Sequence, residues 1–164
     1  MELSFKTLSL LLGIILTGLT AGLCYTWSNA ITPGIGSLDD HTFLKSFQAM
    51  NRAIINPSFI LVFFGPVILL FLNAYWFRNT SPITFWSFLI AALVFFIGVS
   101  VVTVSKNVPL NEILDRSILE VMSKQELAQL RKTFEEPWNR WHWIRTLSSI
   151  ASLILLLMGS FNLK

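Results

Sequence analysis

His142 and Arg145 stand three residues apart, so a helix would place both side chains on one face. A neutral imidazole, whose ordinary pKa is about 6.5, can accept a proton from a substrate carbon. A guanidinium beside it can stabilise the oxyanion that forms when this proton leaves. The pair could therefore serve acid–base chemistry, with His142 as the base and Arg145 as the stabilising cation.

Other polar and aromatic residues lie close to the ends of apolar stretches and could complete such a site. Asparagines could orient the polar rim of a substrate, and tryptophans could supply flat apolar walls for an aromatic ring. The predicted substrate-binding residues are Trp27, Ser28, Gln48, Asn51, Arg52, Asn56, Asn107, Asn111, Trp138 and Trp141. An alternative is open for these residues, because asparagines often cap helix ends, Arg52 could pair with an acid in a loop, and tryptophans could form an interfacial belt.

Four stretches without Asp, Glu, Lys or Arg must position these residues. They lie between Lys6 and Asp39, Arg52 and Arg78, Arg78 and Lys106, and Arg145 and Lys164. Each can hold the roughly 20 apolar residues with which a helix crosses a bilayer. We predict an all-α fold, an up-down bundle of four transmembrane helices at about residues 5–27, 57–77, 83–105 and 138–161. In such a bundle the ends that carry the candidate residues meet at one membrane face.

The composition predicts a single membrane domain over residues 1–164, with the lipid bilayer as a partner. Hydrophobic residues make up 54% of the 164 residues and the mean hydropathy is +0.65, which excludes an ordinary soluble domain. The net charge of +3 is modest and its Lys and Arg are spread among acids, so no nucleic-acid partner is expected. Cys24 is the only cysteine and the two histidines lack metal-ligand spacing, so no disulfide, metal site or other cofactor is predicted.

Residues 39–56 predict a short amphipathic helix at the membrane surface, between the first two transmembrane helices. Asp39 or Asp40 could cap its start. Its apolar side would carry Phe43, Phe47, Met50 and Ile54, and its other side Gln48, Asn51 and Arg52.

Prolines and one capping pattern predict further boundaries. Pro66 should bend the second transmembrane helix, and Pro109 should end the third. Two short amphipathic helices are predicted within residues 112–136. The second starts at Ser123, which forms a capping box with Glu126.

The distribution of basic residues predicts the orientation in the membrane. The face with the candidate site carries nine Lys and Arg residues, whereas the other face carries only Lys6, Arg78 and Lys164. The positive-inside rule then places the long connections in the cytoplasm, in an inner or plasma membrane.

Four pieces of the chain, in the same order, resemble the anthrone-oxygenase-like family of small four-helix membrane proteins. The first piece runs from Gly22 through Trp27-Ser28 to a turn at Pro33, and the second from Phe47-Gln48 through Asn51-Arg52 to Asn56-Pro57. The third is Asn107-Val108-Pro109-Leu110-Asn111, and the fourth consists of Trp138, Trp141 and Arg145-Thr146. At residue 142 the family pattern has Asn where this chain has His, a departure that would alter the chemistry.

The resemblance implies a four-helix membrane fold and a specific reaction. Named members oxidise anthrones to anthraquinones with dioxygen and without a cofactor, so the resemblance implies a hydrophobic polycyclic aromatic substrate. An enolate must then form and pass an electron to oxygen, which are the steps that a base and an oxyanion-stabilising cation would serve.

A second class of function is also open, that of a non-enzymatic membrane module. Such a module would bind a lipid or a quinone-like molecule, or act as an accessory subunit, with the same polar residues as a static plug between helices. A cavity among them would favour binding or catalysis, whereas a cluster in which every side chain is bonded to another would favour the plug.

Overall fold

The computed structural model describes residues 4–163 and contains only helices and connections within that range. The helices, in chain order, are α1 (Phe5–Thr26), η1 (Trp27–Ile31), α2 (Thr32–Gly36), α3 (Asp40–Ile54), α4 (Pro57–Trp76), α5 (Pro82–Phe95), η2 (Phe96–Val101), η3 (Thr103–Asn107), α6 (Val108–Arg116), η4 (Leu119–Val121) and α7 (Lys124–Phe161). Of these, η1, η2 and η3 are π-helices and η4 is a 3₁₀ turn.

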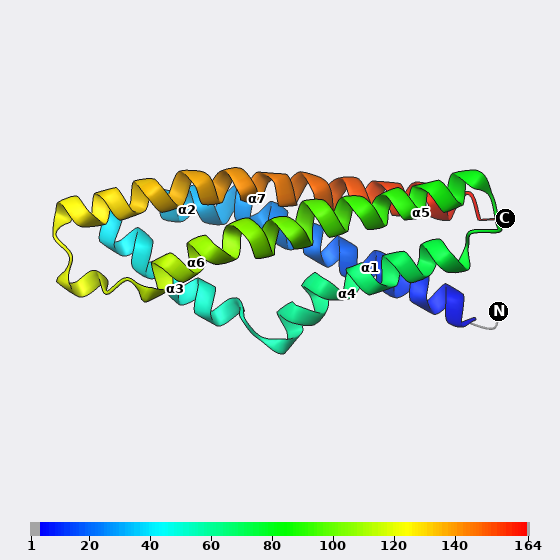
Figure 1. The fold of residues 1–164 in the computed structure, drawn as a ribbon, viewed down its shortest axis with the longest axis horizontal. Helices are drawn as coiled ribbons and strands as arrows, with labels where there is room; N and C mark the ends of the chain where they lie inside the picture. Colours follow the sequence, from blue (N-terminus) through cyan, green and yellow to red (C-terminus); the bar gives the residue numbers. More distant parts are fainter. Residues whose placement is uncertain (1–3, 164) are drawn as a thin grey trace.

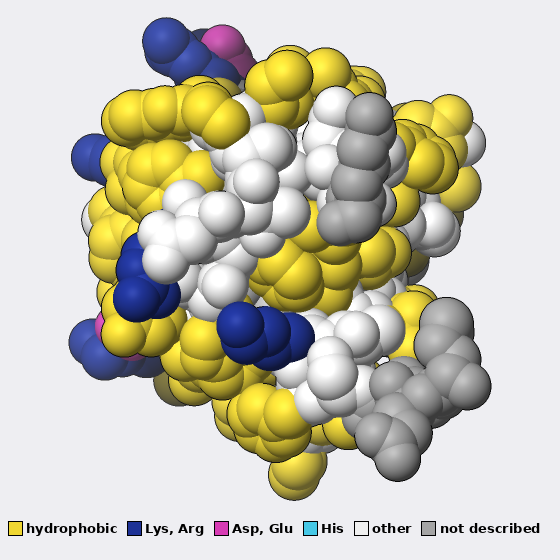
Figure 2. Space-filling view, turned by 90° about the vertical axis from the view of Figure 1, so that its right-hand side faces the viewer, with side chains coloured by type: hydrophobic (Ala, Val, Ile, Leu, Met, Phe, Trp, Pro, Cys, Tyr) yellow, Lys and Arg dark blue, Asp and Glu magenta, His cyan; other side chains and the backbone are white. Residues whose placement is uncertain are grey.

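Four continuous helical rods are long and apolar enough to cross a membrane, as predicted for a multi-pass membrane protein. They cover Phe5–Gly36, Pro57–Trp76, Pro82–Arg116 and Lys124–Phe161. The rods run up and down, and both chain termini lie at one end of the bundle (Figure 1). That end is mostly apolar on its surface, with few Lys or Arg (Figure 2). The connections at the opposite end gather α2, α3, α6 and the start of α7 (Figure 1).

Polar side chains set the starts of the helices. Ser4, Asn56 and Ser81 each accept a hydrogen bond from a backbone N–H in the first turn of the helix that follows. Ser123 and Glu126 form the predicted capping box at the start of α7. Asp39 caps α3, as one of the two predicted candidates.

The first and third rods continue through prolines that were predicted to turn or end them. Pro33 lies in the first turn of α2 and Pro109 in the first turn of α6. Each of these short helices follows a π-helix, η1 or η3, whose wider turns let the chain absorb a residue that donates no hydrogen bond. The predicted turn at Pro33 and stop at Pro109 are therefore wrong.

The fourth rod also begins earlier than predicted. A single helix of 38 residues, α7, includes Pro137 and joins the predicted amphipathic segment after Ser123 to the transmembrane stretch. The segment before Ser123 is likewise not a separate helix, since α6 continues the third rod to Arg116. Only the 3₁₀ turn η4 stands alone between the two rods.

The predicted helix between the first two rods is α3, which lies obliquely across the end of the bundle (Figure 1). Phe43 and Phe47 are buried beneath it and form a cluster with Trp27, Phe134 and Trp138. This aromatic cluster therefore seals one end of the bundle.

Gln48 was predicted on the side of α3 opposite Phe43 and Phe47, but it is buried with them. It is 9% exposed and faces inward together with Phe47. Its amide donates to the carbonyls of Leu114 and Ser117 at 2.7 and 3.0 Å. These carbonyls belong to the last turn of α6, where the helix supplies no partner of its own, so a buried amide is stabilised there.

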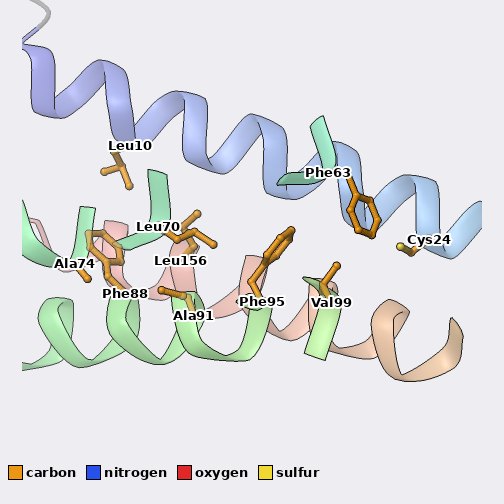
Figure 3. Packing of buried hydrophobic residues seen from close by; sticks show 11 residues of the cluster. Leu10, Cys24, Phe63, Leu70, Ala74, Phe88, Ala91, Phe95, Val99 and Leu156 are labelled. Atoms are coloured by element: carbon orange, nitrogen blue, oxygen red, sulfur yellow. The ribbon is translucent and has the colours of Figure 1, made fainter. Parts of the chain in front are cut away.

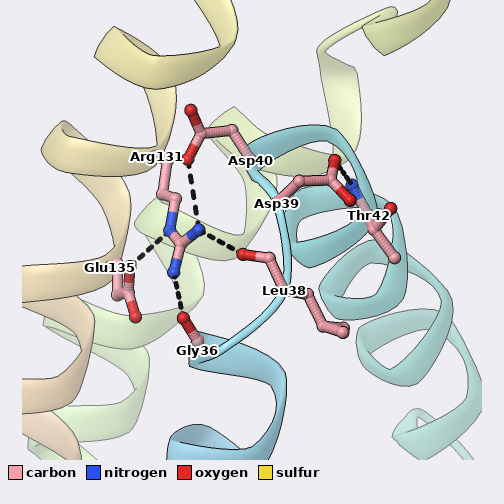
Figure 4. Close-up of polar contacts among 7 residues, drawn as sticks. All are labelled: Gly36, Leu38, Asp39, Asp40, Thr42, Arg131 and Glu135. Atoms are coloured by element: carbon pink, nitrogen blue, oxygen red, sulfur yellow. Dashed lines mark hydrogen bonds and ion pairs between the residues drawn. The ribbon is translucent and has the colours of Figure 1, made fainter.

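Arg131 of α7 ties the α2–α3 connection to the bundle (Figure 4). Its guanidinium donates to the carbonyls of Gly36 and Leu38 at 2.6 and 2.8 Å, and forms ion pairs with Asp40 and Glu135 at 3.1 and 2.7 Å. The side chain is only 16% exposed. Arg131 is therefore not simply a solvated surface charge, because it holds the start of α3 in place.

The centre of the bundle is a second apolar cluster, in which Leu10, Leu70, Phe88, Phe95 and Leu156 from all four rods meet (Figure 3). This cluster fixes the four rods relative to one another and thereby supports the polar end.

Candidate functional site

The three π-helices all lie toward the end of the bundle that was predicted to carry the site. Trp27 begins η1, and Thr103 and Asn107 begin and end η3. All three side chains are buried. Since π-turns widen the helix locally and are often found at functional sites, these turns present side chains that a regular α-helix would aim elsewhere.

A cavity of about 120 Å³ lies beneath α3, between the ends of the rods. Six of the twelve predicted site residues line it, namely Trp27, Asn51, Asn111, Trp138, His142 and Arg145. Its other lining residues are Leu23, Cys24, Phe47, Ile54, Ile55, Phe59, Phe63, Thr103 and Val108. The structure thus brings half of the candidate residues to one partly open space with mostly apolar walls.

Among residues 4–163, Arg145 is the only cation in the cavity lining, and it is 7% exposed. Its guanidinium donates to Nδ1 of His142 at 2.5 Å and to the hydroxyl of Thr103 at 3.4 Å, while its Nε has no partner. Within residues 4–163 it forms no salt bridge, and no Asp or Glu lines the cavity. A buried cation without a counter-charge favours an anion beside it, because burial penalises an isolated charge.

His142 uses both ring nitrogens. Nε2 lies 3.0 Å from the carbonyl of Cys24, which can only accept, so Nε2 carries the proton. Nδ1 is then the lone-pair nitrogen and accepts the hydrogen bond from Arg145. The ring stacks on Trp138 with centroids 4.8 Å apart. This arrangement fixes a neutral imidazole whose lone pair points at the guanidinium.

Two asparagines hold Trp138 in this position. Asn111 accepts a hydrogen bond from the indole N–H at 2.8 Å, and Asn107 donates to the Trp138 carbonyl at 3.2 Å. Asn107 is fully buried, and its Oδ1 has no partner. Trp27 packs against the other side of this region, with its ring 5.7 Å from Trp138. The aromatic wall is therefore fixed by η3 and α6 on one side and by η1 on the other.

Ser28 lies beside the cavity but does not line it. Its hydroxyl shares a hydrogen bond of 2.9 Å with Thr146, which also donates to the carbonyl of His142 at 3.0 Å. The contact joins η1 to α7 and so helps to fix His142 over the end of α1.

Four other predicted residues lie away from the cavity and fit the capping or pairing alternative. Gln48 bonds to the end of α6, as described above. Arg52 pairs with Asp115 at 2.5 Å, and Asn56 caps α4 through a bond of 2.9 Å from the Phe59 N–H. Trp141 packs under the ammonium group of Lys106, 5.1 Å from its ring centroid.

Sequence reasoning missed several residues of the cavity. Thr103 was visible as a polar residue in the third apolar stretch, one helical turn before Asn107, and it is the hydroxyl that accepts from Arg145. Phe59 and Phe63 of α4 and the elbow residues Ile54 and Ile55 also line the space. Nothing in their sequence distinguishes these apolar residues from those that face lipid, so only the packing of α4 reveals them.

A sequence model of the anthrone oxygenase family matches residues 58–155, more than half of the chain. The matched segment includes Thr103, Asn107, Trp138, His142 and Arg145 of the site. Neither the curated proteins nor the solved structures gave a match.

Proposed function

The chain belongs to the anthrone oxygenase family, and from this premise we propose that it oxidises a hydrophobic aromatic ketone or phenol with dioxygen, without a cofactor, at the cavity around Arg145. The substrate class is that of an anthrone, a polycyclic ketone whose ring methylene is a carbon acid. Its apolar body would reach the protein through the bilayer that the four rods cross.

The reaction balances with dioxygen as the only oxidant. A base removes one methylene proton and leaves an enolate, which passes one electron to O₂. The resulting radical pair combines to form a C–O bond, and a proton completes the hydroperoxide. Loss of water from the hydroperoxide then turns the former methylene into a carbonyl. One atom of O₂ ends in the quinone and the other in water.

The single observation that carries this proposal is the uncompensated charge of Arg145. Its guanidinium is buried at the cavity wall, has an unpartnered Nε and has no acid beside it among the described residues. A cation held in this way binds the enolate more strongly than the neutral ketone, and this difference is what lowers the barrier to proton removal.

His142 is the proposed base. In the structure its Nδ1 accepts from Arg145, so this nitrogen is free only when the guanidinium turns to another acceptor. A substrate oxygen at Arg145 is such an acceptor. Substrate binding would thus release the lone pair of His142 next to the carbon acid, which couples recognition of the oxygen to proton removal.

The size of the cavity limits how a substrate can bind. A volume of about 120 Å³ is somewhat smaller than the cavity of roughly 150 Å³ that holds one benzene ring. At most one ring of a tricyclic substrate would fit without movement of the walls. Ile55, between α3 and α4, is a lining residue that lies outside any helix, so the wall lacks helical support there.

The second candidate is a non-enzymatic module that binds a quinone-like molecule. It is favoured by the direct bond between His142 and Arg145, since each side chain satisfies the other in the absence of a substrate. Such a module would bind an aromatic carbonyl compound at the same cavity and consume no oxygen.

Oxygen uptake by the purified protein on addition of an anthrone tests the proposal. The parent protein should exceed the spontaneous rate, and Arg145→Met should lose the excess. With ¹⁸O₂, one labelled atom should appear in the anthraquinone. Arg140→Met is the matched control, because Arg140 is exposed on the same helix. A folded parent protein that binds anthraquinone but takes up no oxygen above buffer would overturn the oxygenase and leave the binding module.

The predicted orientation belongs to the same proposal, with the long connections on the cytoplasmic side. Ser123 and Arg78 lie at opposite ends of the bundle and are exposed. In a Cys24→Ser background, Ser123→Cys should resist an impermeant maleimide added to intact cells, and Arg78→Cys should react. The opposite labelling pattern would invert the orientation.

A further inference from the structure

A positive charge lies deep in the cavity beneath α3, at Arg145. Among residues 4–163, its guanidinium donates only to Nδ1 of His142 and to the hydroxyl of Thr103, and both acceptors are neutral. Its Nε is buried without a partner, and no Asp or Glu of this range lines the cavity. Since a buried, isolated charge is strongly disfavoured within a membrane bundle, the cavity favours an anion at Arg145 whether or not a reaction follows.

The cavity reaches the protein surface beside two apolar side chains. Of the described residues that line it, Ile55 is 68% exposed and Val108 is 37% exposed, and the others are buried or half-buried. Ile55 connects α3 to α4, and Val108 begins α6. The ion pair between Arg52 and Asp115 holds α3 against α6. We call this opening, marked by Ile55 and Val108, the cavity mouth.

The cavity mouth lies level with the end of a membrane span. The second rod covers Pro57–Trp76, so it begins just after Ile55. A bilayer holds charged headgroups at this level and apolar chains further in. From the mouth inward, α4 presents the exposed apolar side chains of Ile60 and Leu61. An occupant can therefore place an anionic head at Arg145 and an apolar chain along this outer surface of α4.

We propose that the cavity binds a single-chain carboxylate amphiphile from the bilayer, a long-chain fatty acid anion, with its carboxylate on Nε of Arg145 and its chain leaving through the cavity mouth. A carboxylate is planar and small, and its oxygens match the N–H groups of a guanidinium. A cavity of about 120 Å³ takes this head and the first methylenes, and the rest of the chain stays in the bilayer. The bound acid occupies the donor that a substrate oxygen needs, so it inhibits the oxygenase; this consequence rests on the proposed function, whereas the binding does not.

The test measures binding of radiolabelled dodecanoate to the protein in phosphatidylcholine nanodiscs at about pH 8, where the free acid is ionised. Empty nanodiscs measure its partition into lipid. The parent protein should bind saturably, and Arg145→Met should weaken binding about tenfold or more, because the carboxylate loses a charged donor. Arg140→Met is the matched control, since Arg140 is exposed on the same helix, and it should keep the parental affinity.

Competition on the parent protein requires no variant. Dodecanol has the same chain without the charge, and acetate has the charge without the chain. Each should displace the labelled acid at least about tenfold less well than unlabelled dodecanoate. Equal displacement by dodecanol would overturn the anion site, and equal displacement by acetate would overturn the amphiphile and leave a site for small anions.

Charges placed at the cavity mouth test where the acid lies. Ile55→Glu should weaken dodecanoate binding about threefold, and Ile55→Lys should strengthen it by a similar factor, because the carboxylate sits in the cavity that Ile55 lines. Ile83→Glu and Ile83→Lys are the matched controls, since Ile83 is 60% exposed at the other end of the bundle (Figure 1). Equal affinities of the two Ile55 variants, or a parent protein that binds no more dodecanoate than empty nanodiscs, would overturn the proposal.

Oxygen uptake with an anthrone separates this proposal from the proposed function. Dodecanoate binding without oxygen uptake would refute only the oxygenase. Oxygen uptake by a parent protein that binds no dodecanoate would refute only the anion site. Uptake that saturating dodecanoate leaves unchanged would refute their competition at Arg145.

Discussion

Thr20 of α1 donates a hydrogen bond of 2.8 Å to the carbonyl of Val62 in α4. This carbonyl is the one that Pro66, four residues later, leaves without its helical partner. Pro66 was predicted to bend α4, and α4 changes direction along its length (Figure 1). A neighbouring rod thus satisfies the acceptor that the proline frees, as buried backbone groups in a membrane require.

Thr20→Val should therefore destabilise the protein by about 1 kcal/mol, because the carbonyl of Val62 loses its donor. Thermal unfolding in detergent would measure the loss. In a Pro66→Ala background the same substitution should cost less, since the N–H of the new alanine can bond to Val62. Equal costs in both backgrounds would contradict the link between Thr20 and Pro66.

His142→Gln and His142→Leu should separate catalysis from structure. Both remove the proposed base, so turnover should fall about a hundredfold or more. His142→Leu should also lower the thermal midpoint, because Arg145 and the Cys24 carbonyl both lose a buried partner. A glutamine variant with parental oxygen uptake would remove His142 from the mechanism.

Gly98→Ala should destabilise the bundle by about 1–3 kcal/mol, since a Cβ at this position would overlap the side chain of Ser148 in α7. The double variant with Ser148→Gly should recover most of the loss. Gly22→Ala is the control, because a Cβ there meets no atom within 4 Å. A similar stability for both alanine variants would mean that η2 and α7 can move apart without cost.

Arg131→Met should loosen the α2–α3 connection, because the carbonyls of Gly36 and Leu38 and two carboxylates lose their common donor. A loss of about 1–3 kcal/mol is expected for a buried, multiply bonded guanidinium. Proteolysis near Ser37 would report the loosening directly. Lys132 is an exposed neighbour, so the Lys132→Met variant should be cleaved at the same rate as the parent protein. Equal cleavage of the two variants would argue against a role for Arg131.

Acid should weaken the start of α3. Hydrogen bonds from Thr42 hold the pKa of Asp39 below its ordinary value of about 3.9. Because this pKa is lowered by folding, the stabilisation is present above pH 4 or so and disappears as the pH falls through the folded-state value. Hydrogen exchange at the Thr42 amide should accelerate in that range. Asp39→Asn, which caps without titrating, should abolish this part of the pH dependence.

Much of the fold followed from the sequence because hydropathy and charge are properties of a local stretch. The gaps without charged residues predicted the four rods, and the alternation of rods predicted which ends meet. The N-cap residues Asp39 and Ser123 were also visible, since a cap acts on its own first turn. The boundaries at Pro33 and Pro109 were wrong because π-turns and tertiary packing accommodate prolines that local rules treat as stops.

The sequence by itself determined that His142, Arg145 and several tryptophans and asparagines gather at one end of a four-helix membrane bundle. Only the tertiary structure decided their partners. Asn56 caps α4 and Arg52 pairs with Asp115 of α6, whereas Asn111 and Asn107 fix Trp138, and Thr103 rather than any acid faces Arg145. A side chain's hydrogen-bond partner depends on which distant element packs against it, and neither residue type nor spacing along one helix contains that information.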